Sequence, residues 1–87
     1  MYSLKFSQKA LKDLSKLDKS IARLIVSWLI KNIDNCDNPR IHGKSLKGNL
    51  CGFWRYRVGD YRILCTINDD ELVVQAITIG HRKEVYL

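Results

Sequence analysis

The sequence predicts an α+β domain in which two N-terminal helices pack on one face of a mostly antiparallel sheet, in the order β-α-α-β-β-β. Three observations support this. Apolar residues recur at helical spacing in the first third of the chain, later segments alternate as strands do, and glycines or polar clusters separate those segments. A chain of 87 residues has room for one hydrophobic core, so residues 1–87 are expected to form a single domain.

The N-terminal third predicts a strand and two helices. Residues 2–6 alternate as a half-buried strand does, and Ser7 can cap a helix with an apolar stripe over residues 10–17. Asp18 or Ser20 can cap the second helix. Its apolar stripe is wider than one sheet contact needs, which indicates either deep burial or a partner-binding face. The stripe consists of Ile21, Leu24, Ile25, Val26, Trp28, Leu29, Ile30 and Ile33.

The second half predicts three antiparallel strands after a flexible basic connection over residues 40–52. A glycine stands first in the two-residue link Gly59-Asp60, as a type II′ hairpin turn requires. A second, polar link joins the last two strands. The expected strands cover residues 53–58, 61–67 and 72–79.

The predicted hairpin determines which side chains share a face. With a two-residue turn, Arg57 lies opposite Arg62, and alternation places Arg55 on the same face. Two arginines directly opposite each other destabilise a sheet mildly unless an anion lies between them. This favours an anion-binding face, and the alternatives are that the arginines extend into solvent or pair with an acid such as Glu84. The other face, which the helices should cover, takes Trp54, Tyr56, Val58, Ile63, Cys65 and Ile67.

The charge distribution favours a polyanionic partner. The net charge is +6, and residues 40–64 carry six Lys or Arg against one Asp, whereas residues 65–87 have a net charge of −2. The basic segment also contains several aromatic residues. Cations interleaved with aromatic rings suit a nucleic acid. A solvated basic surface without a partner is the alternative.

Several other classes of protein fit the sequence poorly. No stretch approaches the roughly 18 consecutive apolar residues of a membrane span, and lysines interrupt any N-terminal signal, so a cytoplasmic protein without membrane contact is expected. The cysteines Cys36, Cys51 and Cys65 are widely spaced and form no Cys-x-x-Cys pair, which argues against zinc and favours reduced thiols. No metal or other cofactor is expected.

Three stretches carry a family resemblance: Leu46-Lys47-Gly48, the run FWRYRVGDYRIL at 53–64 and the ending GHRKEVY at 80–86. Because the order β-α-α-β-β-β matches as well, nearly the whole chain resembles the RelE/ParE superfamily of bacterial toxins. The ending favours the RelE branch, whose members cut messenger RNA, typically in the ribosomal A site, and are held inactive by a cognate antitoxin. The resemblance therefore implies messenger RNA, the ribosome and an antitoxin as partners, with operator DNA bound only through the antitoxin complex.

The resemblance also implies roles for individual residues. Arg62 would bind phosphate, Arg82 would stabilise the transition state or assist the leaving group, and Tyr86 would orient or activate the ribose or stack on a base. Lys44 and Lys47 of the basic connection are expected to contact RNA. The nucleophile is the 2′-OH of the RNA, so the expected products are a 2′,3′-cyclic phosphate and a 5′-hydroxyl.

The sequence departs from RelE at two positions of the expected RNA-binding face. Arg55 and Arg57 stand where RelE has lysines. Because arginine stays protonated, Arg57 can bind phosphate but is a poor general base. His81 or Tyr86 would then have to accept the proton, and histidine has the more suitable pKa.

Two other functions stay open at this stage. A ParE-like toxin that poisons DNA gyrase shares the fold and the Tyr-Arg strand, although the His-Arg-x-x-Val-Tyr ending argues against it. A catalytically inactive RNA-binding relative is the second, because lysines are replaced by arginines on the expected site. Messenger RNA cleavage and gyrase-linked DNA breaks after induced expression distinguish the three.

Overall fold

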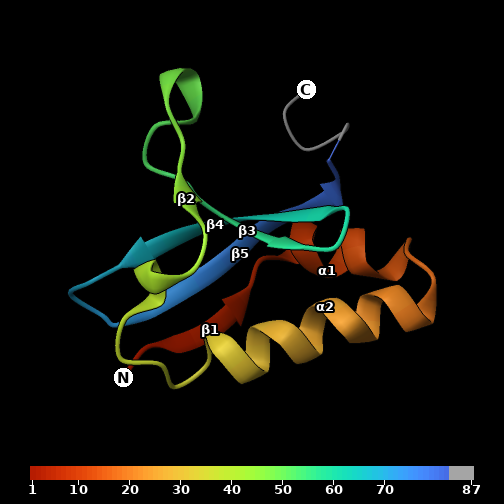
Figure 1. The fold of residues 1–87 in the computed structure, drawn as a ribbon, viewed down its shortest axis with the longest axis horizontal. Helices are drawn as coiled ribbons and strands as arrows, with labels where there is room; N and C mark the ends of the chain where they lie inside the picture. The colour runs from red at the N-terminus through yellow and green to blue at the C-terminus, as the bar shows by residue number, and fades with distance from the viewer. Residues whose placement is uncertain (83–87) are drawn as a thin grey trace.

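The computed structural model describes residues 1–82 and shows a five-stranded sheet with both α-helices on one face (Figure 1). The strand order is β1-β5-β4-β3-β2. Strand β1 runs parallel to β5, and the other neighbours are antiparallel. The predicted α+β architecture is confirmed. Its elements are β1 (Ser3–Phe6), α1 (Gln8–Ser15), α2 (Lys19–Asn32), the 3-10 turn η1 (Pro39–Ile41), β2 (Lys44–Ser45), the 3-10 turn η2 (Gly48–Leu50), β3 (Trp54–Val58), β4 (Tyr61–Asn68) and β5 (Val73–His81).

The two helices begin where the sequence predicts. The Ser7 hydroxyl oxygen accepts a hydrogen bond from the backbone N–H of Ala10 at 3.0 Å, which caps α1. Asp18, rather than Ser20, occupies the N-cap position of α2, and its side chain makes no capping hydrogen bond. Within residues 1–82, no helix has the length and apolar character needed to cross a membrane.

Helix α1 also covers the open edge of β5. Strand β1 pairs with β5 only as far as Ala76, so the backbone beyond that residue needs other partners. The Ser7 hydroxyl donates to the carbonyl oxygen of Ile77 at 2.9 Å, and the N–H of Ile79 donates to the Asp13 carboxylate at 3.0 Å. These two side chains fix the last part of β5, which leads to the candidate site.

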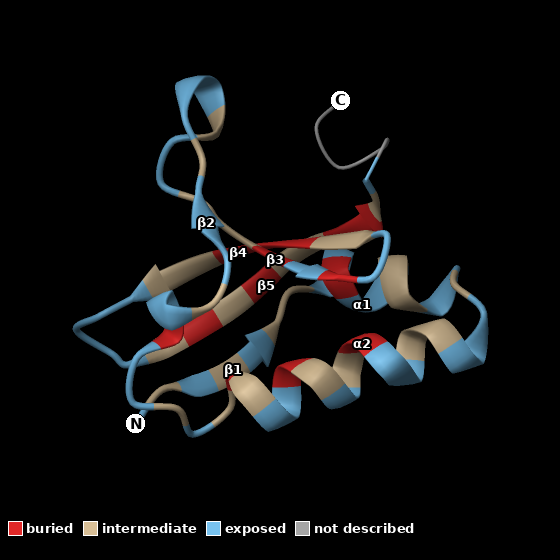
Figure 2. Ribbon diagram, in the orientation of Figure 1, coloured by how far each residue is buried: buried red, intermediate tan, exposed pale blue. Residues whose placement is uncertain are grey.

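The apolar stripe of α2 divides into a buried and an exposed part. Ile25, Leu29 and Ile33 are fully buried against the sheet. Leu24 and Ile30 remain 59% and 54% exposed. Figure 2 shows this division along the helix. Burial therefore accounts for one side of the stripe, and the outer side keeps two large apolar residues in solvent.

The β3–β4 hairpin has the predicted turn and register. Gly59 has a φ of +59°, the backbone conformation that the first residue of a type II′ turn requires. The face that the helices cover is buried at Tyr56, Val58, Ile63 and Cys65, while Trp54 and Ile67 pack against its margin. The paired residues are Val58 with Tyr61, Arg57 with Arg62, Tyr56 with Ile63 and Arg55 with Leu64.

The prediction of a flexible connection over residues 40–52 is wrong. This part of the chain contains β2 and two 3-10 turns, and β2 adds a fifth strand to the sheet. The segment is anchored by side chains of β3. The Trp54 Nε1–H donates to the His42 carbonyl oxygen at 2.7 Å, and the Tyr56 hydroxyl donates to the Pro39 carbonyl oxygen at 2.6 Å. Residues 44–53, called the arm below, project from the sheet on the side away from the helices (Figure 1).

The three cysteines are unbonded thiols in different environments. Cys51 is exposed, Cys36 is half-buried and Cys65 is buried in the core. Burial raises the pKa of the Cys65 thiol to about 12. Among residues 1–82, no three side chains of His, Cys, Asp or Glu gather in a group that could hold a metal ion.

Candidate nucleic-acid-binding face

Three arginines and a lysine share the sheet face that neither α-helix covers. Arg57 pairs with Arg62 across the hairpin, and Arg55 pairs with Leu64 on one side and with Lys44 on the other. Residues directly opposite each other in neighbouring strands project from the same face. The predicted arginine face (Arg55, Arg57 and Arg62) is therefore present, and β2 extends it to Lys44.

The turn between β3 and β4 brings a fifth cation, Arg82, to this face. The backbone N–H of Arg82 donates to the carbonyl oxygen of Asp60 in the turn at 2.9 Å. Arg62 Nη1 in turn donates to the Arg82 carbonyl oxygen at 3.5 Å, and Arg57 Nε donates to the Gly59 carbonyl oxygen at 3.3 Å. Three arginines thus lie around one tight turn, Arg57 and Arg62 with hydrogen bonds from their side chains and Arg82 with hydrogen bonds of its backbone. Guanidinium groups suit a phosphate, because each presents paired N–H donors.

Arg40 belongs to the basic segment but has a different environment. Its Nη1 and Nη2 donate to the two carboxylate oxygens of Asp69 at 2.9 and 3.1 Å, and its guanidinium lies 6.0 Å from the centre of the Trp54 ring. The Tyr2 hydroxyl also donates to Asp69, at 2.6 Å. The hydrogen bonds from Arg40, and then from Tyr2, hold the pKa of the Asp69 carboxyl below its usual value. Arg40 is thus neutralised in an ion pair.

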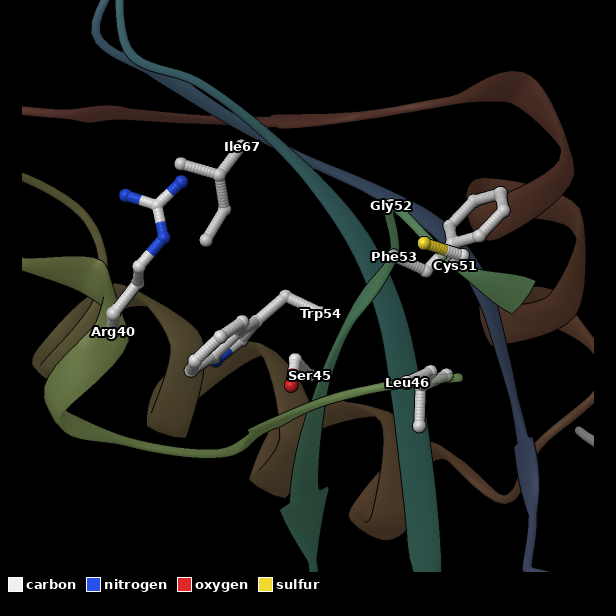
Figure 3. Close-up of a pocket in the computed structure, with 8 residues that line it drawn as sticks. All are labelled: Arg40, Ser45, Leu46, Cys51, Gly52, Phe53, Trp54 and Ile67. Carbon is white, nitrogen blue, oxygen red and sulfur yellow. The ribbon is translucent and has the colours of Figure 1, made fainter. Parts of the chain in front are cut away.

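A hollow of about 370 Å³ lies beside Arg40 at the base of the arm. In Figure 3, Arg40 and Ile67 lie on one side of it, and Leu46, Cys51 and Phe53 lie on the other. No residue of the arginine face lines it, so it is separate from the candidate site. Among residues 1–82, the lining is Arg40, Ser45, Leu46, Cys51, Gly52, Phe53, Trp54 and Ile67.

The structure does not bring His81 together with the arginine face. His81 pairs with Tyr61, and the two rings meet edge-on with their centroids 5.7 Å apart. Tyr61 precedes Arg62 in β4, so it projects to the opposite side, where it packs against the core. Sequence reasoning ended the last strand at residue 79 and left His81 unconstrained. Strand β5 includes His81, and alternation therefore sets its direction.

The remaining predicted residues fall in three places. Lys44 is exposed on β2, and Lys47 is exposed in the arm at the start of η2. Tyr86 and Glu84 lie outside the described residues. Asp60 and Gly59, which sequence reasoning considered only as turn residues, hold the cluster through their carbonyl oxygens.

Several arginines thus gather around one turn, on the sheet face that neither α-helix covers, and comparisons with known proteins show the family to which this small α+β domain belongs. Residues 4–86 match the family described as the ParE toxin of type II toxin-antitoxin system, parDE. The chain is 31% identical to Toxin RelG of Mycobacterium tuberculosis H37Rv, over 98% of this chain and 95% of that protein. It is also 31% identical to the mRNA interferase toxin RelE of Escherichia coli K12, over 98% and 90% of the two chains.

A solved structure supports the same relationship. The toxin–antitoxin complex RelBE2 from Mycobacterium tuberculosis contains a chain that matches this one with a TM-score of 0.85 and 31% identity, over 93% of this chain and 98% of that chain. This chain therefore belongs to the RelE/ParE superfamily of toxins of type II toxin–antitoxin systems. The resemblance inferred from the sequence is confirmed.

Proposed function

We propose that this protein is a ribosome-associated endoribonuclease that cleaves messenger RNA in the cytoplasm and thereby inhibits translation. The observation that carries the proposal is the meeting of Arg57, Arg62 and Arg82 at the β3–β4 turn. A similar protein from Escherichia coli is named an mRNA interferase, which supports the reaction class.

The proposed reaction uses the RNA itself as the nucleophile. The 2′-OH attacks the neighbouring phosphorus, the bond to the 5′-oxygen of the next nucleotide breaks, and that oxygen leaves as a hydroxyl. The protein has to align the attack and stabilise charge on the phosphoryl oxygens. Arg62 and Arg57 suit those oxygens, and Arg82 suits the transition state or the leaving group. No metal ion is required by this scheme.

The residue that accepts the proton from the 2′-OH differs from the one that the sequence favoured, which was His81. Arg57 stays protonated and cannot serve well as a base. His81 lies against Tyr61, on the other side of the sheet from Arg62. We therefore give the proton transfer to Tyr86, whose role the family resemblance implies, and treat His81 as a residue that positions Arg82. Arg55, Lys44 and Lys47 would bind the RNA backbone beside the cleavage position.

The proposed inhibitor is a cognate antitoxin. The RelBE2 structure is that of a toxin–antitoxin complex, which supports a protein partner of this kind. An acidic antitoxin segment would neutralise the arginine face, and the exposed Leu24 and Ile30 of α2 offer an apolar contact. Operator DNA would be bound through the antitoxin complex, so the isolated toxin should show no preference for its operator.

Induced expression in bacteria tests this function. Messenger RNA is examined by primer extension, protein synthesis by isotope incorporation, and DNA by gyrase-linked breaks, at confirmed expression. New messenger RNA ends together with arrested translation are expected. DNA breaks without messenger RNA cleavage would favour the gyrase poison, a candidate kept by the match to the ParE-named family. Normal growth would favour an inactive relative.

A further inference from the structure

A second hollow, of about 350 Å³, opens at the edge of β3 next to the arginine face. Strand β2 pairs with β3 at two positions only, Lys44 with Arg55 and Ser45 with Trp54. The rest of this edge of β3 therefore has no paired strand within residues 1–82. The hollow is lined by Trp28, His42, Gly43, Lys44, Arg55 and Arg57.

Contacts with the core hold the wall of this hollow in place. The His42 carbonyl oxygen accepts a hydrogen bond from Trp54, and the His42 ring meets the Trp28 ring edge-on with centroids 5.5 Å apart. Gly43 has a φ of +80°, and an added Cβ would collide with the carbonyl oxygen of Arg55. The backbone of the wall therefore lies tightly against β3. A preorganised wall loses little entropy when a ligand binds.

The lining has the composition of a nucleotide site. Lys44, Arg55 and Arg57 are cations, Trp28 and His42 are aromatic, and none of the six lining residues is acidic. Nucleic-acid sites that hold single strands combine a cationic groove with rings on which bases stack. The volume is at the low end of the roughly 300–1,000 Å³ of small-ligand sites, which suits one nucleotide rather than a larger group.

We propose that this hollow is a nucleotide subsite, which takes one base of the RNA against His42 and Trp28 and the adjoining phosphate between Lys44 and Arg55. The inference rests on the proposed function, because Arg57 belongs both to the hollow and to the cluster at the β3–β4 turn. Arg55 and Arg57 are two residues apart on one strand face, about 6.6 Å. This is comparable to the spacing of phosphates in an extended single strand, so RNA held at Arg62 can continue into the hollow.

The test measures whether removing one base of the RNA and removing the His42 side chain weaken binding independently or through the same contact. Single-stranded RNA oligonucleotides carry a 2′-O-methyl group that blocks cleavage, and each contains one abasic nucleotide at a different position. Dissociation constants are measured for the purified full chain, for His42→Ala and for a matched control, Ile41→Ala. Ile41 is the neighbouring residue, is 71% exposed and does not line the hollow. Thermal unfolding of each variant verifies that it folds. Trp28 is left unchanged because it also packs against Tyr56.

One abasic position is expected to weaken binding to the unmodified protein by about tenfold, the effect of losing one stacked base. His42→Ala should weaken binding of the intact oligonucleotide by a similar factor and should remove the effect of that abasic position. Ile41→Ala should behave as the unmodified protein does. Lys44→Ala should keep the abasic effect but lower the slope of log affinity against log salt by about one phosphate contact.

Cleavage of messenger RNA by the same proteins separates this inference from the proposed function. Suppose that cleavage is lost in Arg62→Ala, but that no abasic position weakens binding or that the weakening is the same in His42→Ala. The proposed nuclease function would then stand, and the subsite would be overturned. Coupling between His42 and one base without any cleavage would support the subsite on a protein that is not a nuclease. Absence of measurable RNA binding at low salt would overturn the subsite outright.

Discussion

Arginines have different partners at the two ends of β3. Near its start, Arg40 donates two hydrogen bonds to the carboxylate of Asp69. Near its end, Arg57 donates to a backbone carbonyl oxygen in the adjoining turn. A carboxylate neutralises a guanidinium, whereas a carbonyl orients the group and leaves its net charge.

The difference shows why the net charge of a segment overstates the number of cations that are available to bind an anion. Both arginines contribute equally to the net charge of the basic segment. Arg40 fixes the start of that segment to the link between β4 and β5, and its substitution should change the stability of the fold. Arg57, Arg62 and Arg82 surround the β3–β4 turn, and their substitution should change the activity.

Removal of Arg62 or Arg82 should give the largest effect and the sharpest test of this division. Arg62→Ala and Arg82→Ala should each lower the rate of messenger RNA cleavage at least about a hundredfold, because losing one donor to a charged transition state costs on the order of 3 kcal/mol. The melting temperature should change little, since Arg82 is exposed and Arg62 lies outside the core.

Arg23→Ala is the matched control for this prediction. Arg23 is exposed on the outer side of α2 and should affect neither cleavage nor stability. Full toxicity and full cleavage in both Arg62→Ala and Arg82→Ala would show that the site is assigned to the wrong face.

A substitution of Gly43 tests whether the start of β3 serves the stability of the fold. Gly43→Ala places a Cβ against the Arg55 carbonyl oxygen at a φ of +80°, so the free energy of unfolding should fall by more than about 2 kcal/mol. Gly48 also has a positive φ, +67°, but an added Cβ there meets nothing within 4 Å. Gly48→Ala should therefore cost only about 1 kcal/mol. Denaturant unfolding of both variants measures the difference, and equal losses would mean that this segment does not lie tightly on β3.

His81→Ala should have a smaller effect on cleavage than either arginine substitution. The His81 ring packs on Tyr61 at the helix-covered side, so a loss of less than about tenfold is expected from displacement of Arg82. Because the proposed general base is Tyr86, the shape of the pH–rate profile should not change in His81→Ala. Loss of the acid limb of that profile in His81→Ala, with the fold retained, would return the role of general base to His81.

Local rules were sufficient for the hairpin but not for the segments around it. A two-residue turn and the alternation of side chains determine which residues pair, so the arginine face could be predicted from residues 53–67. The chain that leads into the arm is held at Pro39 and His42 by the Tyr56 hydroxyl and the Trp54 indole N–H, which come from a later strand, and no local pattern contains these contacts. The direction of His81 depends on the extension of β5 beyond Ile79 to Gly80 and His81. The N–H of Ile79 itself donates to Asp13, which lies on a helix distant in the sequence.

The smallest expected effect concerns Asp69, the partner of Arg40. Its pKa is lowered in the folded state, chiefly by the hydrogen bonds from Arg40 and Tyr2. A lowered folded pKa gives stability that is present above the unfolded pKa of about 3.9 and is lost as the pH falls through the folded value. Asp69→Asn should therefore be slightly less stable than the unmodified protein at pH 7, and the gap should close as the pH falls below about 4. The effect is small because solvent screens an exposed ion pair.

Thermal unfolding between pH 7 and pH 2 measures this gap, and Asp70→Asn is the matched control. Asp70 is the next residue and is also exposed, but it is not part of the ion pair with Arg40, so its substitution should produce no comparable gap. Cleavage of messenger RNA at neutral pH should be the same in Asp69→Asn as in the unmodified protein, because Arg40 then loses a structural partner and the arginine face loses nothing. A stability gap that does not depend on pH would rule out the ion pair as its source. A large loss of cleavage with the fold intact would place Arg40 among the RNA-binding residues, and the division between the two ends of β3 would fail.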